Sequence, residues 1–252
     1  MIKLILEYDG TGFSGWQIQP DKRTVQGELE IALSRLTGDR ISTVAAGRTD
    51  AGVHALGQAV SFKTDSKHPD HVFCRALNSL LPRDVVVLAA EEAPEEFHAR
   101  RSARGKCYRY LIRDRPARAA LSRDRVWHLR RLLELAAVRK ATTHLIGNHD
   151  FTSFRSASCE AKSPIREMRR IEVYRDGHGL MVIEMWASAF LKQMARAIVG
   201  TLTEVGTGKR RPEEIKTILE AKDRERAGVT APPQGLYLVC VDYEEPLKEN
   251  KG

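Results

Sequence analysis

The chain has 252 residues, a formal net charge of +8 at pH 7, 42% hydrophobic residues and 29% charged residues. This composition is typical of a soluble globular protein with one large or two small domains, and the absence of any run of about 18 apolar residues excludes a transmembrane helix. Glu7 and Asp9 interrupt the N-terminal apolar run, so no signal peptide is predicted.

In the first hundred residues, apolar and charged side chains alternate over 2–8, which predicts a strand. Helical spacing of apolar residues from Val25 to Leu36, with Gly38 at the position of a C-terminal stop, predicts a helix. Further patterns predict strands at 41–46, 57–63 and 85–90, and a helix that begins at Pro69 and ends at Pro82. The first half therefore has the order β-α-β-β-α-β.

The second half repeats that order after a break near 95–105. A strand at 105–113 places Tyr108, Tyr110 and Ile112 on one face. Apolar spacing predicts helices over 132–146, from about Phe190 to Val205, and from Pro212. Strands near 167–175 and 179–187 are joined at Asp176-Gly177, a strong hairpin signal, and 235–243 is apolar on both faces, as in a central strand. Two units of this order suggest two ferredoxin-like halves.

The loop after strand 41–46 contains one carboxylate, Asp50, framed by Gly47 and Gly52 and preceded by Arg48. The sequence holds no other Asp or Glu between residues 39 and 65. A lone carboxylate in this setting suits a nucleophile better than a member of an acid/base pair. An ordinary Asx-turn carboxylate is the alternative, and the spacing alone does not choose between them.

Three other patterns suggest ligand sites but have simpler explanations. G-x-G-x-x-G at 10–15 follows a strand, but no helix begins there, so we expect a loop that shapes the backbone near a cleft rather than a dinucleotide site. His68 and His71 flank a helix start and lack further ligands nearby, so no metal site is predicted. The four cysteines are far apart and form no Cys-x-x-Cys, which argues against a disulfide framework or a cysteine zinc site and suits a reducing cytosol.

Positive charge is concentrated in residues 100–131, called the basic segment below. Twelve Lys and Arg are opposed there by two Asp, so the segment carries +10 and the remaining chain −2. The same segment contains Tyr108, Tyr110, Trp127 and His128. A solvated face without a partner is the alternative, but cations for phosphates and flat rings for unstacked bases together favour RNA binding.

These residues carry a resemblance to a known family. The chain resembles the TruA family of tRNA pseudouridine synthases at the loop 47–55, Gly-Arg-Thr-Asp-Ala-Gly-Val-His-Ala, which corresponds to the active-site motif of that family. The resemblance extends in order over nearly the whole chain, through the segments 7–17, 24–29, 97–100, 108–110, 150–154, 199–202 and 235–238.

The resemblance implies the pseudouridine synthase fold. This is an α+β architecture of two ferredoxin-like (βαββαβ) halves around a mainly antiparallel sheet, with the active site in a basic cleft. We therefore expect an N-terminal α+β half at 1–100 that carries the Asp50 loop. A C-terminal α+β half at 101–252 should carry the tyrosine strand and a basic RNA-binding surface.

The implied activity is the isomerisation of uridine to pseudouridine at positions 38, 39 and 40 in the anticodon stem-loop of tRNA. The target base would be flipped out of its stack before the reaction. No metal, nucleotide cofactor or other cofactor is expected. The expected partners are tRNA and a second copy of the chain in a homodimer, with no membrane association, and the expected location is cytoplasmic.

The resemblance also assigns roles to residues. Asp50 would be the nucleophile, attacking either ribose C1′ or uracil C6. Tyr108, the first residue of Tyr-Arg-Tyr, would stack on the uracil or assist removal of the C5 proton, and Cys107 stands before it where relatives commonly have a basic residue. Arg196 would pair with Asp50 and keep it ionised. The spacing alone places Arg196 outside the apolar stripe of its helix, where solvent exposure is the alternative.

Three arginines are expected to contact the substrate. Arg48 would occupy the gap left by the flipped base or hold its phosphate. Arg101 and Arg104, in the basic segment, would bind RNA phosphates. Two other function classes remain open at this point: a tRNA-binding protein without catalysis, and an N-glycoside hydrolase. Paired carboxylates would favour the hydrolase, and Asp50 has no near partner in the sequence.

Overall fold

The computed structural model describes residues 1–243, and its first part has the predicted order of elements. These elements are β1 (Ile2–Tyr8), α1 (Val25–Thr37), β2 (Val44–Ala45), β3 (His54–Phe62), α2 (Asp70–Leu80) and β4 (Val85–Glu92). In β1 the four apolar residues that alternate along the strand are all buried. The hydroxyl of Thr24 accepts a hydrogen bond from the amide of Gly27 at the start of α1, and Gly38 ends the helix with a φ of +80°.

One strand is shorter than the sequence indicates. The apolar run 41–46 predicts six strand residues, but β2 contains only Val44 and Ala45. Side chains of α1 bind the preceding backbone instead: the carboxylate of Glu30 accepts from the amide of Thr43 at 2.8 Å, and the amide of Gln26 donates to the carbonyl of Thr43 at 3.2 Å. Thr43 therefore has no need of a neighbouring strand for its backbone hydrogen bonds.

The second part contains more elements than the sequence predicts. They are β5 (Gly105–Asp114), β6 (Trp127–Leu129), α3 (Leu135–Thr142), β7 (Gly147–Asp150), β8 (Ile165–Arg175), β9 (Met181–Ala187), α4 (Met194–Gly206), α5 (Glu214–Ala221) and β10 (Leu236–Asp242). The sequence patterns do not predict β6 and β7, because three or four residues are too few for a periodic pattern. The predicted helix 132–146 is limited to α3 and a following 3-10 turn, Thr143–Leu145.

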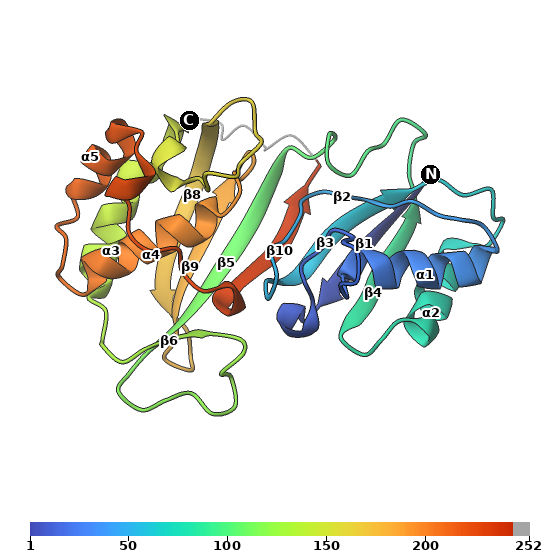
Figure 1. Cartoon of the computed structure of the whole chain (residues 1–252), viewed down its shortest axis with the longest axis horizontal. Helices are drawn as coiled ribbons and strands as arrows, with labels where there is room; N and C mark the ends of the chain where they lie inside the picture. The colour runs from blue at the N-terminus through green and yellow to red at the C-terminus, as the bar shows by residue number, and fades with distance from the viewer. Residues whose placement is uncertain (244–252) are drawn as a thin grey trace, which may run out of the picture.

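The ten strands within residues 1–243 form one mostly antiparallel sheet, in the order β4-β1-β3-β10-β5-β9-β8-β7, with β2 beside β3 and β6 beside β5. The predicted hairpin of β8 and β9 is confirmed. The last strand, β10, lies between β3 and β5, so the predicted central position of 235–243 is correct and the C-terminal strand joins the two parts of the sheet (Figure 1). This α+β architecture with a large antiparallel sheet agrees with the expected fold class.

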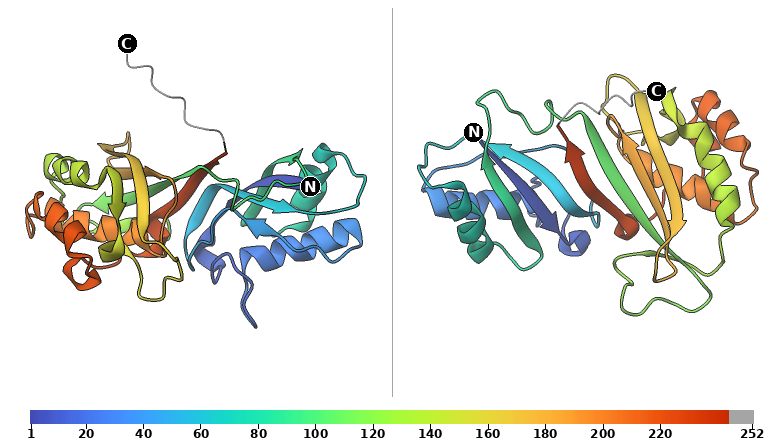
Figure 2. Two further views of the ribbon diagram at one scale, coloured as in Figure 1. Left: turned by 90° about the horizontal axis from the view of Figure 1, so that it is seen from above. Right: turned by 180° about the vertical axis from the view of Figure 1, so that it is seen from behind.

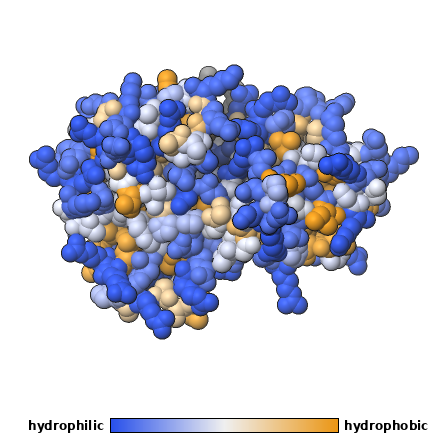
Figure 3. All heavy atoms as spheres, viewed as in Figure 1, coloured by the Kyte–Doolittle hydropathy of each residue, from blue (hydrophilic) through white to orange (hydrophobic). Residues whose placement is uncertain are grey.

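The helices lie on one side of this sheet. Seen from behind, the strands β10, β5, β9 and β8 stand in front of the helices and no helix covers them (Figure 2). On the helix side, hydrophilic residues dominate the surface and hydrophobic ones form separate spots (Figure 3). No helix within the described residues is long and apolar enough to cross a membrane.

Candidate active site

An ion pair between Asp50 and Arg196 joins the first part of the chain to the second. Asp50 lies in the loop before β3, and Arg196 lies in the first turn of α4. The guanidinium Nη1 of Arg196 donates to Oδ2 of Asp50 at 2.9 Å, and the side chains of Arg196 and Asp50 are 13% and 32% exposed, respectively. Arg196 is thus largely buried against the carboxylate rather than solvent-exposed, while Asp50 keeps a face open to a ligand.

A second contact fixes the direction of the Arg196 side chain. Its Nε donates to the carbonyl of Ala231 at 2.7 Å, and the amide of Ala231 donates back to the carbonyl of Arg196 at 3.1 Å. The segment before Ala231 passes very close to α4, because a Cβ on Gly200 would come within 1.7 Å of the carbonyl oxygen of Val229. Glycine at 200 therefore allows the approach that holds the guanidinium toward Asp50.

Three contacts that the sequence patterns do not reveal support the Asp50 loop. Lys106 of β5 donates to the carbonyl of Ala46 at 2.6 Å, Gln58 of β3 donates to the carbonyl of Gly47 at 2.7 Å, and the hydroxyls of Tyr8 and Thr49 are hydrogen-bonded at 2.8 Å. Burial lowers the pKa of Lys106 to about 8. Strands from both parts of the sheet therefore hold the backbone before the carboxylate.

The glycine loop at 10–15 also supports the Asp50 loop. A Cβ on Gly10 would come within 2.0 Å of the carbonyl oxygen of Val53, and the amide of Trp16 donates to the carbonyl of Thr49 at 3.0 Å. Gly15 has a φ of +91°, and a Cβ there would come within 2.7 Å of the Thr49 carbonyl oxygen. These close backbone approaches confirm that the loop shapes the backbone around the site.

Replacing Gly15 with Ala should therefore disturb the Asp50 loop. The positive φ and the clash with Thr49 together predict a loss of about 1–3 kcal/mol in the free energy of unfolding. Gly38→Ala is the matched control, because Gly38 has a φ of +80° and an added Cβ would meet no atom of the described residues within 4 Å beyond its chain neighbours. Thermal denaturation should show a loss in both variants, but only Gly15→Ala should lower the reaction rate per folded molecule. Equal rates for the two variants would contradict the supporting role of Gly15.

Tyr108 lies beside this site on β5, where it is 7% exposed. The ring of Phe190 packs edge-on against it, with centroids 4.8 Å apart. Burial raises the pKa of the Tyr108 hydroxyl, and the negative charge of Asp50 contributes to the increase. The hydroxyl is therefore neutral in the free protein. Tyr110, on the same face, belongs to the core: it is fully buried and its hydroxyl donates to the carbonyl of Pro232 at 2.6 Å.

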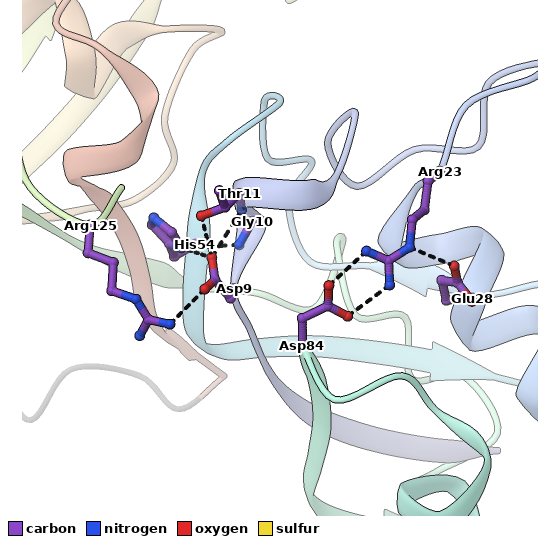
Figure 4. Close-up of polar contacts among 8 residues, drawn as sticks. All are labelled: Asp9, Gly10, Thr11, Arg23, Glu28, His54, Asp84 and Arg125. Carbon is purple, nitrogen blue, oxygen red and sulfur yellow. Dashed lines mark hydrogen bonds and ion pairs between the residues drawn. The ribbon is translucent and has the colours of Figure 1, made fainter. Parts of the chain in front are cut away.

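A polar network connects the glycine loop to the basic segment (Figure 4). Arg125 donates to Oδ2 of Asp9 at 2.7 Å, and Oδ1 of Asp9 accepts from the amide and the hydroxyl of Thr11. Buried His54 accepts from the amide of Gly10 through Nδ1 at 3.1 Å, and its Nε2 is 3.2 Å from the carbonyl of Asp124. Burial lowers the pKa of His54, which agrees with a neutral ring protonated at Nε2.

This network places part of the basic segment next to the Asp50 loop. Asp124 and Arg125 precede β6 in the second part of the sheet, whereas His54 begins β3 directly after the loop. The ring of Tyr237 stacks on His54 with centroids 4.7 Å apart, and its hydroxyl donates to the carbonyl of Arg125 at 2.7 Å. The histidine of the motif 47–55 is thus a packing and hydrogen-bonding residue in the free protein.

The three arginines expected to contact substrate differ in their distance from the ion pair. Arg48 lies exposed in the Asp50 loop itself, whereas Arg101 and Arg104 lie exposed before β5. The structure does not bring Arg101 and Arg104 into the ion pair of Asp50 and Arg196, and they remain candidates for phosphate contacts at a distance.

His68 and His71 are exposed at the start of α2, as the helix-start interpretation predicts. Residues 1–243 contain no group of three His, Cys, Asp or Glu side chains that could hold a metal ion.

Comparison with known proteins gives a consistent result. A family model described as tRNA pseudouridine synthase matches residues 4–100 and 141–244, so the stretch containing Tyr108 lies between the matched regions. A protein named tRNA pseudouridine synthase A from Geotalea uraniireducens is 45% identical over 242 residues, which covers 96% of this chain and 99% of the relative. Proteins of the same name from Ruminiclostridium cellulolyticum and Caldicellulosiruptor bescii are both 47% identical over 242 residues, with the same coverage.

Proposed function

Because this chain belongs to the tRNA pseudouridine synthase family, we propose that it isomerises uridine to pseudouridine at positions 38, 39 and 40 of the tRNA anticodon stem-loop. Membership of this family makes the chain a tRNA pseudouridine synthase, which is an isomerase. The observation that carries the proposed aspartate chemistry is the ion pair of Asp50 and Arg196 at 2.9 Å, which joins the family motif before β3 to α4.

In the proposed mechanism Asp50 is the nucleophile. Its carboxylate forms a bond to ribose C1′ or uracil C6, the C1′–N1 bond breaks and the C1′–C5 bond forms. The bond to Asp50 also breaks, which regenerates the free carboxylate. The C5 proton is then lost and N1 gains a proton, so there is no net redox change. The contact with Arg196 supports this role, because a guanidinium stabilises the ionised carboxylate and fixes its direction. The partial exposure of Asp50 leaves room for an approaching ribose or base.

Tyr108 is proposed to act on the same nucleotide. Its ring, held by Phe190, offers a face on which uracil can stack. Attack by Asp50 transfers its negative charge to the uracil. Tyr108 then stacks on the uracil or assists removal of the C5 proton, for which a hydroxyl beside the base can serve as the acid–base group.

The target uridine must leave its stack to reach Asp50, since stacking and pairing hide the reactive atoms of the base. Arg48 lies two residues before Asp50 and is exposed. We propose that it fills the space of the flipped base or holds the adjacent phosphate. The basic segment then provides the surface for the rest of the anticodon arm, and Arg125 fixes part of this segment beside the Asp50 loop.

The proposal extends to the organisation of the molecule. Within the first part the strands run β4-β1-β3-β2, and within the second β10-β5-β9-β8. When the short strands β6 and β7 are left out, the strands of both parts have the same order, numbered along the chain within each part, and this supports two ferredoxin-like halves divided near residue 100. The expected C-terminal half spans residues 101–252, and its last residues, 244–252, lie outside the described part of the chain. A homodimer in the cytoplasm that holds one tRNA between two copies remains the expected assembly.

Phosphate binding by Arg101 and Arg104 predicts a salt dependence. The logarithm of the tRNA binding constant should fall with the logarithm of salt concentration, by about 0.7–0.9 per phosphate contact. Replacing both arginines with Gln should reduce this slope by about 1.4–1.8 if each binds one phosphate. Filter binding at a series of salt concentrations measures the slope.

Arg35→Gln with Arg40→Gln is the matched control for that experiment. It removes the same charge from the first part of the chain, outside the basic segment. This pair should leave the slope nearly unchanged. Equal slopes for the two double variants would mean that Arg101 and Arg104 face away from the bound RNA.

The activity itself is tested with unmodified tRNA. After incubation with the protein, carbodiimide treatment and primer extension should give stops that mark pseudouridine at positions 38, 39 or 40. Release of free uracil would instead indicate an N-glycoside hydrolase. Binding of tRNA with no change in any uridine would indicate a tRNA-binding protein without catalysis. Stops only outside the anticodon arm would retain the isomerase and overturn the proposed positions.

A further inference from the structure

Two cysteines that are far apart in the sequence lie opposite each other in the sheet. Cys107 belongs to β5 and Cys240 to β10, and the antiparallel register pairs Cys240 with Cys107. Directly opposed residues on antiparallel strands have Cβ atoms about 4.5–5.5 Å apart, close to the spacing of a disulfide. The register shifts between Leu238 and Cys240, so the strand bends locally at this pair. All four cysteines of the chain are free in this structure.

The pair combines a buried and an accessible thiol. Cys107 is 2% exposed, whereas Cys240 is exposed. Strand alternation places Cys107 on the face opposite to its neighbour Tyr108, and that face of β10 and β5 has no helix over it (Figure 2). A small oxidant can therefore reach Cys240 without entering the active site, and the register places Cys107 opposite the oxidised residue.

The opposed thiols affect each other's ionisation. The neighbouring Cys107 thiol lowers the pKa of Cys240. The neighbouring Cys240, together with burial, raises the pKa of Cys107. Cys240 is therefore the more readily ionised of the two thiols, and the thiolate is the form that reacts with peroxides. Cys240 is therefore expected to react first with the oxidant, and Cys107 is expected to act second as the resolving thiol.

We propose that Cys107 and Cys240 form a reversible cross-strand disulfide when the protein meets a peroxide. The Cys240 thiolate attacks one oxygen of hydrogen peroxide, the O–O bond breaks, and the sulfur becomes a sulfenic acid while the other oxygen leaves as water. Cys107 then attacks this sulfur, the S–S bond forms, and a second water leaves. Two thiols lose two electrons in total and hydrogen peroxide gains them. A thiol reductant reverses the modification.

The disulfide should slow the reaction, a consequence that rests on the proposed role of Tyr108. Closing an S–S bond of about 2.05 Å draws β10 and β5 together at Cys107. Tyr108 follows Cys107 directly in β5, and displacements of about 1 Å in a catalytic group can cost up to about 10² in rate. We expect a fall of about tenfold in the single-turnover rate of the oxidised protein. The rate should return after reduction.

The experiment treats the reduced full-length protein with a small excess of hydrogen peroxide, blocks remaining thiols, and maps peptides without reduction. A peptide pair joining Cys107 and Cys240 is expected in the wild type and absent in Cys107→Ser and Cys240→Ser. Cys74→Ser is the control, since Cys74 lies outside the pair, and should keep the cross-link. Oxidation of Cys240 to sulfinic acid without a cross-link, or a cross-link to another cysteine, would overturn the proposal.

Activity is measured on the same samples. The wild type should lose rate in proportion to the mapped disulfide and regain it with dithiothreitol, while Cys240→Ser should be unaffected by peroxide. A complete disulfide with an unchanged rate would overturn the link to Tyr108. The peptide map decides the cross-link whether or not the protein forms pseudouridine, so failure of the proposed function would be seen separately.

Discussion

Replacing Asp50 with Asn is expected to abolish pseudouridine formation, with a fall of at least about 10⁴-fold in the single-turnover rate. The amide keeps the size of the carboxylate, and its oxygen can still accept the hydrogen bond from Arg196 that Asp50 accepts at 2.9 Å. What it loses is the negative charge and the nucleophilic oxygen. Affinity for tRNA should change little, because the Asp50 side chain does not supply a cation for a phosphate.

Asp84→Asn is a suitable control for this variant. Asp84 accepts two hydrogen bonds from Arg23, at 2.7 and 2.9 Å, beside the glycine loop (Figure 4). The change from carboxylate to amide is the same, but it lies outside the ion pair of Asp50. We expect a modest loss of stability and a nearly normal rate per folded molecule. An Asp50→Asn rate within tenfold of the wild type would exclude Asp50 as the nucleophile.

Replacing Tyr108 with Phe is expected to lower the single-turnover rate by about 10² or more, the usual scale of general acid–base catalysis. The ring remains for stacking on the uracil and for the edge contact with Phe190, so only the hydroxyl is lost. Single-turnover rates on a tRNA with one target uridine are the appropriate measurement, because slow product release can hide a chemical defect in the steady state.

Tyr110→Phe is the matched control for Tyr108. It also removes a buried hydroxyl from β5, and with it the hydrogen bond to the carbonyl of Pro232 at 2.6 Å. Stability should fall by about 1 kcal/mol, the net value of a typical hydrogen bond, and the rate should be nearly unchanged. If Tyr108→Phe is as fast as the wild type, Tyr108 is a stacking platform only and water or another group takes the C5 proton.

Local patterns are sufficient to predict most of the first part of the fold. Alternating burial in β1 and the glycine stop after α1 follow directly from residues 2–8 and Gly38, because both depend on neighbours in sequence. The predicted strand 41–46 is too long because Glu30 and Gln26, which bind the backbone of Thr43, act from another element. Apolar content alone carries no information about such side-chain partners.

The candidate site, like the fold, is predicted only in part by the sequence. The glycine frame points to Asp50 and the family resemblance to Arg196, but neither reveals the support from Lys106 and Gln58, which depends on how β5 and β3 lie relative to the loop. A usable signal does exist for Lys106: it stands two residues before Tyr108 and so shares its strand face. For Cys107 and Cys240 no pattern can reveal the pairing, because it arises only when β10 is placed beside β5.

The most direct test of the account is capture of the covalent bond to Asp50. A tRNA with 5-fluorouridine at the target position carries fluorine where the C5 proton must leave, so an adduct formed by the nucleophile should persist. Denaturing gels and peptide mapping should locate the RNA on Asp50, and Asp50→Asn should form no adduct. An adduct on another residue, or an adduct of equal yield with Asp50→Asn, would contradict the account.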